Sequence, residues 1–112
     1  MKLWIDDVRP APIGEEYIVC KSVNLAKQLI IAWEIGNYGY EEMLEMFGPT
    51  IELIDIDHDA GEYANNGGDY VKLLDWLEET GRNYPIRIHS ANPVGVANMR
   101  RIIERNGWKE IY

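Results

Sequence analysis

The sequence has one cysteine, few basic residues and no long apolar run, and each shortage excludes a class of protein. Because Cys20 has no second cysteine to pair with, no intrachain disulfide forms, which is typical of a cytoplasmic protein. The chain has 11 lysines and arginines and 19 acidic residues, which gives a net charge of −8. A surface that binds duplex DNA needs cations to neutralise phosphates, so we expect no duplex partner. No apolar stretch approaches the roughly 18 residues of a membrane span, so we expect no membrane partner.

Length and the first residues add two further expectations. A chain of 112 residues is large enough to bury one core without metal or disulfide staples, so we expect a single domain over residues 1–112. Two acids, at positions 6 and 7, follow the first apolar residues directly, so residues 1–7 do not begin the apolar region of a signal peptide, which again favours the cytoplasm. Cys20 itself lies in an apolar run and is more typical of buried packing than of a nucleophile.

Short apolar runs alternate with segments of helical spacing along the whole chain. We expect strands over residues 2–6, 17–20, 51–57, 86–89 and 108–112, and helices over 22–36, 41–47, 69–80 and 92–106. Residues 7–16, with two prolines and a glycine, predict a loop in place of the first crossover helix, and residues 58–68 predict a second loop. The alternation implies an α/β fold with a parallel sheet and right-handed crossovers. Five such strands predict a flavodoxin-like three-layer sandwich with strand order 2-1-3-4-5.

Polar clusters follow three of the expected strands at the point where each ends. Residues 6–10 read Asp-Asp-Val-Arg-Pro, residues 57–59 read Asp-His-Asp, and residues 89–93 read His-Ser-Ala-Asn-Pro. The carboxyl ends of parallel strands share one edge of the sheet, where α/β proteins bind ligands. We therefore expect the three clusters to meet in one crevice, which a stable core does not require and which is the candidate functional site.

The acids of this crevice suit a hard divalent cation. Asp6, Asp7 and Asp57 would lie at the ends of neighbouring strands, and adjacent carboxylates repel unless a cation or hydrogen bonds compensate. Oxygen ligands of this kind suit Mg²⁺ or a similar ion. The alternative is that one acid caps a turn, another pairs with Arg9, and the remaining one is solvated.

The two histidines are candidates for proton transfer. His58 and His89 each follow a strand directly, and imidazole titrates near neutral pH, so the pair could act as general acid and base on a phosphate or cyclic phosphate. Alternatively, Asp59 or Asp57 simply holds a structural histidine in one orientation. Zinc is less favoured, because the nearby ligands are mostly oxygen and the sole cysteine lies in another strand.

The remaining polar residues of the crevice are candidate ligand-binding groups: Arg9, Asp59, Ser90 and Asn92. Arg9 offers a planar fork either to phosphate or to a neighbouring carboxylate. Asn92 followed by Pro93 predicts a helix N-terminus, which presents free N–H groups to an anion, although ordinary capping also explains it. Ser90 has no base beside it in the sequence, so we do not expect a serine nucleophile.

Four segments together resemble one family, the cyclic-phosphate processing receiver domains. Residues 4–10 (Trp-Ile-Asp-Asp-Val-Arg-Pro) resemble the family's opening L-D-D-x-R-P, and residues 56–60 (Ile-Asp-His-Asp-Ala) resemble L-D-H-D-L. Residues 68–71 resemble its glycine-led helix start, and residues 89–95 match H-S-x-N-P-x-G in full. The resemblance implies a receiver-type fold and a role with cyclic phosphates of nucleotides or RNA ends.

The resemblance also assigns roles and shows departures. It implies that Asp6, Asp7 and Asp57 form the receiver acid pocket, with Asp57 at the position that ordinary receivers phosphorylate. Asp55 departs from the pattern, because the family tends to have a small residue there, and residues 38–47 lengthen the second crossover. Lys109 is not a clear counterpart of the receiver lysine.

Two functions follow from these observations. The first is metal-assisted processing or binding of a small phosphorylated ligand or nucleotide, with catalytic roles for His58, His89 and Asp57. The alternative is a non-catalytic signalling or sensing module with Asp57 as the phosphoacceptor.

Overall fold

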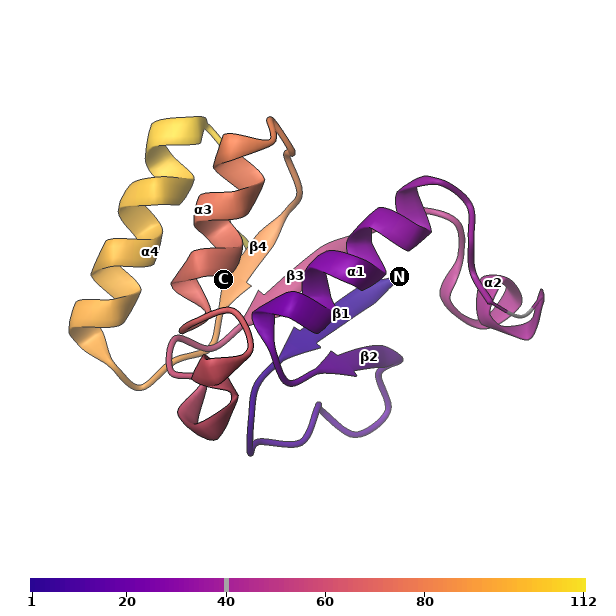
Figure 1. Ribbon diagram of the computed structural model, residues 1–112, viewed down its shortest axis with the longest axis horizontal. Helices are drawn as coiled ribbons and strands as arrows, with labels where there is room; N and C mark the ends of the chain where they lie inside the picture. Colours follow the sequence, from indigo (N-terminus) through magenta and orange to yellow (C-terminus); the bar gives the residue numbers. More distant parts are fainter. Residues whose placement is uncertain (40) are drawn as a thin grey trace.

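Four parallel strands form the sheet that organises residues 1–39 and 41–112, which the computed structural model describes (Figure 1). They are β1 (Lys2–Ile5), β2 (Tyr17–Cys20), β3 (Leu53–Ile56) and β4 (Ile86–Ile88). Their order is β2-β1-β3-β4, and every neighbouring pair is parallel. The expected parallel sheet and the first four places of its order are confirmed.

The expected fifth strand, residues 108–112, does not form as a strand. This segment does lie beside β4, where Glu110 makes one parallel bridge with Ile86. Ile86 donates its N–H to the carbonyl of Lys109 and accepts from the N–H of Ile111, at 2.9 and 2.8 Å. β4 pairs with β3 over all three of its residues, but it pairs with this last segment at Ile86 alone, so the fifth strand is reduced to a single bridge.

The loop expected in place of the first crossover helix is confirmed, and it changes the layering. Residues 6–16 contain no helix or strand. The three longer helices, α1 (Val23–Glu34), α3 (Val71–Glu79) and α4 (Pro93–Asn106), pack in series, α1 on α3 and α3 on α4. Figure 1 shows α1 and α3 in front of the strands and α4 beside α3. The expected three-layer sandwich is therefore wrong: within the described residues helices cover one face of the sheet only.

Local signals set the ends of these helices. The Ser22 hydroxyl accepts from the Leu25 N–H at 3.1 Å, and the Asn92 side chain accepts from the Gly95 N–H at 3.0 Å, so both act as N-caps. Gly107 ends α4 in the left-handed conformation, with φ of 68°. None of the described helices combines the length and the apolar character that a membrane span requires.

Two segments between the main elements form short helices. The expected helix over residues 41–47 is present as α2 (Glu41–Phe47), within an insertion in which Tyr40 lies outside the described residues. Residues 58–68, expected to be an irregular loop, contain a 3₁₀ helix, η1 (Gly61–Asn65). Its end is fixed to α1 by a hydrogen bond of 3.1 Å from the Asn24 N–H to the Asn66 carbonyl.

Side chains alternate between the two faces of the sheet. Leu3, Ile5, Ile54 and Ile56 are fully buried in the core, and their register places them on one face. The opposite face carries a row formed by Trp4, Asp55 and Arg87 on three adjacent strands. Trp4 and Asp55 are also buried, so this second face has a polar and aromatic packing of its own.

Candidate functional site

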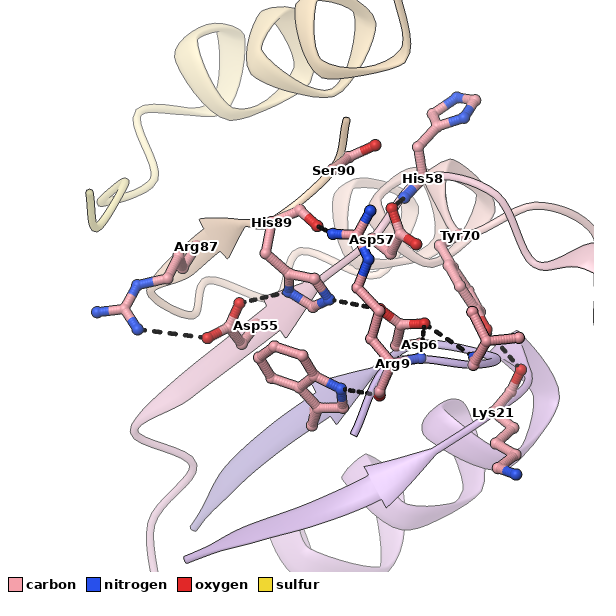
Figure 2. Close-up of polar contacts among 12 residues, drawn as sticks. Asp6, Arg9, Lys21, Asp55, Asp57, His58, Tyr70, Arg87, His89 and Ser90 are labelled. Carbon is pink, nitrogen blue, oxygen red and sulfur yellow. Dashed lines mark hydrogen bonds and ion pairs between the residues drawn. The ribbon is translucent and has the colours of Figure 1, made fainter. Parts of the chain in front are cut away.

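Three distant segments meet at the carboxyl edge of the sheet. The Asp57 N–H donates to the Ile5 carbonyl, and the His89 N–H donates to the Ile56 carbonyl, each at 2.9 Å. These bonds extend the strand pairing one residue beyond β1, β3 and β4 and bring the three polar clusters together, as Figure 2 shows for Asp6, Asp57 and His89.

Three carboxylates form a cluster at this edge. One oxygen from each of Asp6, Asp7 and Asp57 lies within 4.8 Å of the others. Asp6 and Asp57 are buried and Asp7 is partly exposed. An octahedral Mg²⁺ ion with oxygens at about 2.0–2.1 Å needs neighbouring ligands about 3 Å apart and opposite ones about 4 Å apart. The donor set therefore fits Mg²⁺ in chemistry, and a small contraction would bring it to the required spacing.

Asp6 also closes the turn after β1. Its Oδ1 accepts the N–H groups of Val8 and Arg9 at 3.0 and 2.9 Å, and its Oδ2 faces His89. Burial raises the pKa of Asp6, but the backbone bonds from Arg9 and Val8 and the contact with His89 outweigh burial, so the pKa lies below its ordinary value. Asp6 thus remains an anion, as a cation ligand must.

His89 lies between two carboxylates. Its Nδ1 is 2.6 Å from Asp55 Oδ1 and its Nε2 is 2.9 Å from Asp6 Oδ2 (Figure 2). The Trp4 ring stacks on the imidazole, with centroids 3.8 Å apart and planes 5° apart. Burial lowers the pKa of His89, but the hydrogen bonds to Asp55 and Asp6 prevail and raise the pKa above its ordinary value. Both ring nitrogens are occupied, so His89 as placed holds Asp6 in position.

Asp55 gains a role that the sequence did not indicate. Besides His89, its Oδ2 accepts from the Tyr17 hydroxyl at 3.0 Å and lies 3.4 Å from Arg87 Nη1. The sequence marks Asp55 only as a departure from the family pattern. The contribution of Trp4, Tyr17 and Arg87 to the site was missed, although Trp4, Asp55 and Arg87 share one row in the sheet register.

Tyr70 is a second residue that sequence reasoning missed. Its side chain is fully buried, and its hydroxyl donates to the Lys21 carbonyl at 2.8 Å (Figure 2). Burial and the charges of the three clustered acids raise its pKa. The ring thus lies close to the acids and ties the end of β2 to the start of α3.

The two histidines do not face each other. His58 Nδ1 is 2.8 Å from Asp59 Oδ1, and a side-chain carbon on Gly95 would lie 2.4 Å from the His58 ring. The ring therefore packs directly on the first turn of α4, and Figure 2 shows it pointing away from Asp6 and His89. This contact matches the alternative in which Asp59 orients a histidine.

The other predicted ligand groups border the crevice. Arg9 donates from Nη1 to the His89 carbonyl at 3.2 Å, and it forms no ion pair with a carboxylate among the residues described. Ser90 Oγ accepts the Asn92 N–H at 3.2 Å, and Asn92 caps α4, so both serve local structure. Lys109 is exposed in the segment beside β4.

Two hollows lie near the ends of the sheet. One, of about 400 Å³, adjoins Asp7 at the carboxyl edge. A larger one, of about 500 Å³, lies at the opposite edge among Trp33, Tyr38 and Tyr84. Only the first adjoins the clustered acids.

Comparison with known proteins identifies the family. Residues 1–105 match the cyclic-phosphate processing receiver domain. The chain belongs to this family. It is also similar to a mitochondrial RNA-binding protein, RMD9, of Scheffersomyces stipitis, with 29% identity over 89 residues. That match covers 75% of this chain and 14% of the relative, so the chain corresponds to a small part of that protein. No solved structure matches the chain.

Proposed function

We propose that this receiver domain binds a divalent cation, Mg²⁺ or similar, on Asp6, Asp7 and Asp57 and processes a cyclic phosphate of a nucleotide or RNA end. The observation that carries the proposal is the approach of the three carboxylate oxygens to within 4.8 Å at the strand ends. Membership of the cyclic-phosphate processing family supports the phosphate, and the RNA-binding relative accords with a ligand derived from RNA.

Residues around this ion would have separate roles in binding the phosphate and in positioning the ligands of the cation. When bound, the cation would polarise a phosphoryl oxygen and offset the repulsion among the acids. His89 would keep Asp6 aligned, in the way that outer hydrogen bonds orient metal ligands. Arg9, exposed above the His89 carbonyl, would approach the phosphate as a planar donor.

Of the two histidines, His58 would transfer a proton more readily than His89, once its ring turns from the position in which it points away from Asp6 and His89 (Figure 2). Asp59 holds His58 Nδ1, while Nε2 has no partner within the described part of the chain. A histidine with one nitrogen oriented by a carboxylate and the other available has the arrangement of a general acid or base. His89 would have to leave Asp6 or Asp55 before it transferred a proton.

The test is turnover of 2′,3′-cyclic nucleotides with increasing Mg²⁺. We expect hydrolysis that EDTA abolishes, that Asp57→Asn reduces by at least tenfold, and that Asp75→Asn on α3 leaves unchanged. Retention of divalent-cation binding in Asp57→Asn, measured by calorimetry, would contradict the proposed ligand set. Metal-independent turnover would contradict the role of the cation.

A second candidate function is phosphorylation of Asp57 as a signal. One observation favours it: Asp57 Oδ1 accepts the His58 N–H at 2.8 Å, while Oδ2 has no hydrogen-bond partner among the described residues. Incubation with a small phosphodonor followed by intact-mass measurement distinguishes the two functions. An adduct of one phosphoryl group that Asp57→Asn abolishes would favour signalling, and no adduct would exclude it.

A further inference from the structure

A hollow of about 400 Å³ opens beside the clustered acids, between the loop after β1 and the 3₁₀ helix η1. Its lining consists of Asp7, Val8, Gly61, Glu62 and Tyr63. The volume lies in the range of small-molecule sites. Asp7 belongs both to the acidic cluster and to this hollow, so a ligand whose phosphate lies at the acids would extend into it.

The walls of the hollow suit a flat aromatic group. Val8 is 80% exposed, an apolar side chain presented to solvent directly after two acids. Tyr63 lies in η1, where its N–H donates to the Ala60 carbonyl at 3.0 Å, and its ring is partly buried with Lys21 Nζ 6.0 Å from its centroid. A partly exposed tyrosine ring that borders a hollow is the kind of surface on which nucleobases stack.

The charged groups of the lining are all hydrogen-bond acceptors. Asp7 and Glu62 supply carboxylates, and no lysine or arginine lines the hollow. A carboxylate accepts from the exocyclic amino group of cytosine, adenine or guanine, and it repels the corresponding carbonyl of uracil.

We propose that this hollow holds the base of a nucleoside cyclic phosphate and prefers a base that carries an exocyclic amino group. The proposal rests on the proposed function, because the phosphate held at Asp6, Asp7 and Asp57 is what places the base. It narrows the ligand from cyclic phosphates in general to nucleotides, with cytosine favoured over uracil among bases of equal size.

The experiment compares three ligands in saturating Mg²⁺ by calorimetry: 2′,3′-cyclic CMP, 2′,3′-cyclic UMP and glycerol 1,2-cyclic phosphate, which has no base. We expect cyclic CMP to bind about five- to a hundredfold more tightly than the glycerol compound, the range that loss of one base stack produces. Tyr63→Ala should remove most of this ratio and Tyr63→Phe should keep it. Glu62→Gln should bring cyclic UMP close to cyclic CMP. Tyr112→Ala, at an exposed position outside the lining, is the control.

The outcomes separate this proposal from the proposed function. If the glycerol compound binds as tightly as the nucleotides, or if Tyr63→Ala leaves their ratio unchanged, the base site is wrong and the cyclic-phosphate function stands. If cyclic UMP binds more tightly than cyclic CMP, the amino-group preference is overturned. If none of the three ligands binds, both proposals fail.

Discussion

Replacing Asp55 by asparagine removes one of the two carboxylates that hold the His89 ring. The change keeps the shape of the side chain and its oxygen acceptor, so His89 Nδ1 retains a partner at the position now 2.6 Å away. The charge beside His89 is lost, and the amide nitrogen takes the place of Oδ2, so the Tyr17 hydroxyl and Arg87 lose their acceptor at every pH. His89 and Asp55 are largely buried, with 14% and 1% of the side chains exposed, so solvent screens this pair weakly.

The magnitude and the sign follow from the protonation of His89. Hydrogen bonds between charged groups contribute about 1.5–3 kcal/mol to stability and neutral ones about 1 kcal/mol, so the loss of the charge costs about 0.5–2 kcal/mol while His89 is protonated. The native-state pKa of His89 is raised above its ordinary value of 6.5. Its contribution to stability is therefore complete below 6.5 and is lost as the pH rises through the native-state pKa. The cost of Asp55→Asn should be largest in mildly acidic solution and shrink in alkaline solution.

Urea unfolding at about pH 6 and about pH 9 measures this difference. Asp59→Asn is the matched control, because Asp59 pairs with the other histidine but is 64% exposed, and exposed pairs contribute little. A two-histidine chain also allows His89 to be followed directly by NMR, and its pKa should fall in Asp55→Asn. A loss of stability that is equal at both pH values, or no larger than that of Asp59→Asn, would refute the reasoning.

Three further substitutions or reactions test separate parts of the molecule. Gly61→Ala should weaken divalent-cation binding at least tenfold in calorimetry, because the added side-chain carbon would lie 2.4 Å from Asp7 Oδ2. Gly81→Ala is the control: Gly81 has a similar positive φ with open space around it, so this variant should bind the cation normally. Asn92→Ala should lower the free energy of unfolding by about 1 kcal/mol through loss of the cap, and Asn92→Ser should restore most of it. A loss of cyclic-nucleotide turnover in Asn92→Ser at normal stability would instead indicate ligand contact. Burial raises the pKa of Cys20 to about 12, so iodoacetamide should leave the native protein unmodified and label it only in denaturant; labelling of the native protein at the denatured rate would contradict this burial.

Patterns confined to one segment predicted the fold well. Ser22 and Asn92 cap the helices that they were expected to start, and the proline-rich residues 7–16 form the expected loop. The prediction of a fifth strand was wrong because strand pairing depends on the partner strand, and β4 pairs with residues 108–112 at Ile86 alone. The prediction of a three-layer sandwich was wrong because it assumed helices on both faces of the sheet. One face carries polar and aromatic side chains that pack on one another in place of a helix.

The candidate site, too, was predictable from the sequence in part only. The order of the strands was enough to predict that Asp6, Asp57 and His89 meet at one edge, because parallel strands all end on the same side. It was not enough to separate the two histidines, since the direction of a ring depends on what packs against it. His58 lies against Gly95, and His89 lies under Trp4.

The sequence by itself determined which residues reach the carboxyl edge of the sheet, because strand direction and local caps are encoded in short runs of neighbouring residues. Only the tertiary structure decided the partners of each group: that Asp55 and Asp6 share one imidazole, and that Asp7 borders both the acids and a hollow. The reason is physical. Partners 34 and 83 residues apart along the chain are set by strand register and by packing across the sheet, and no local pattern specifies either.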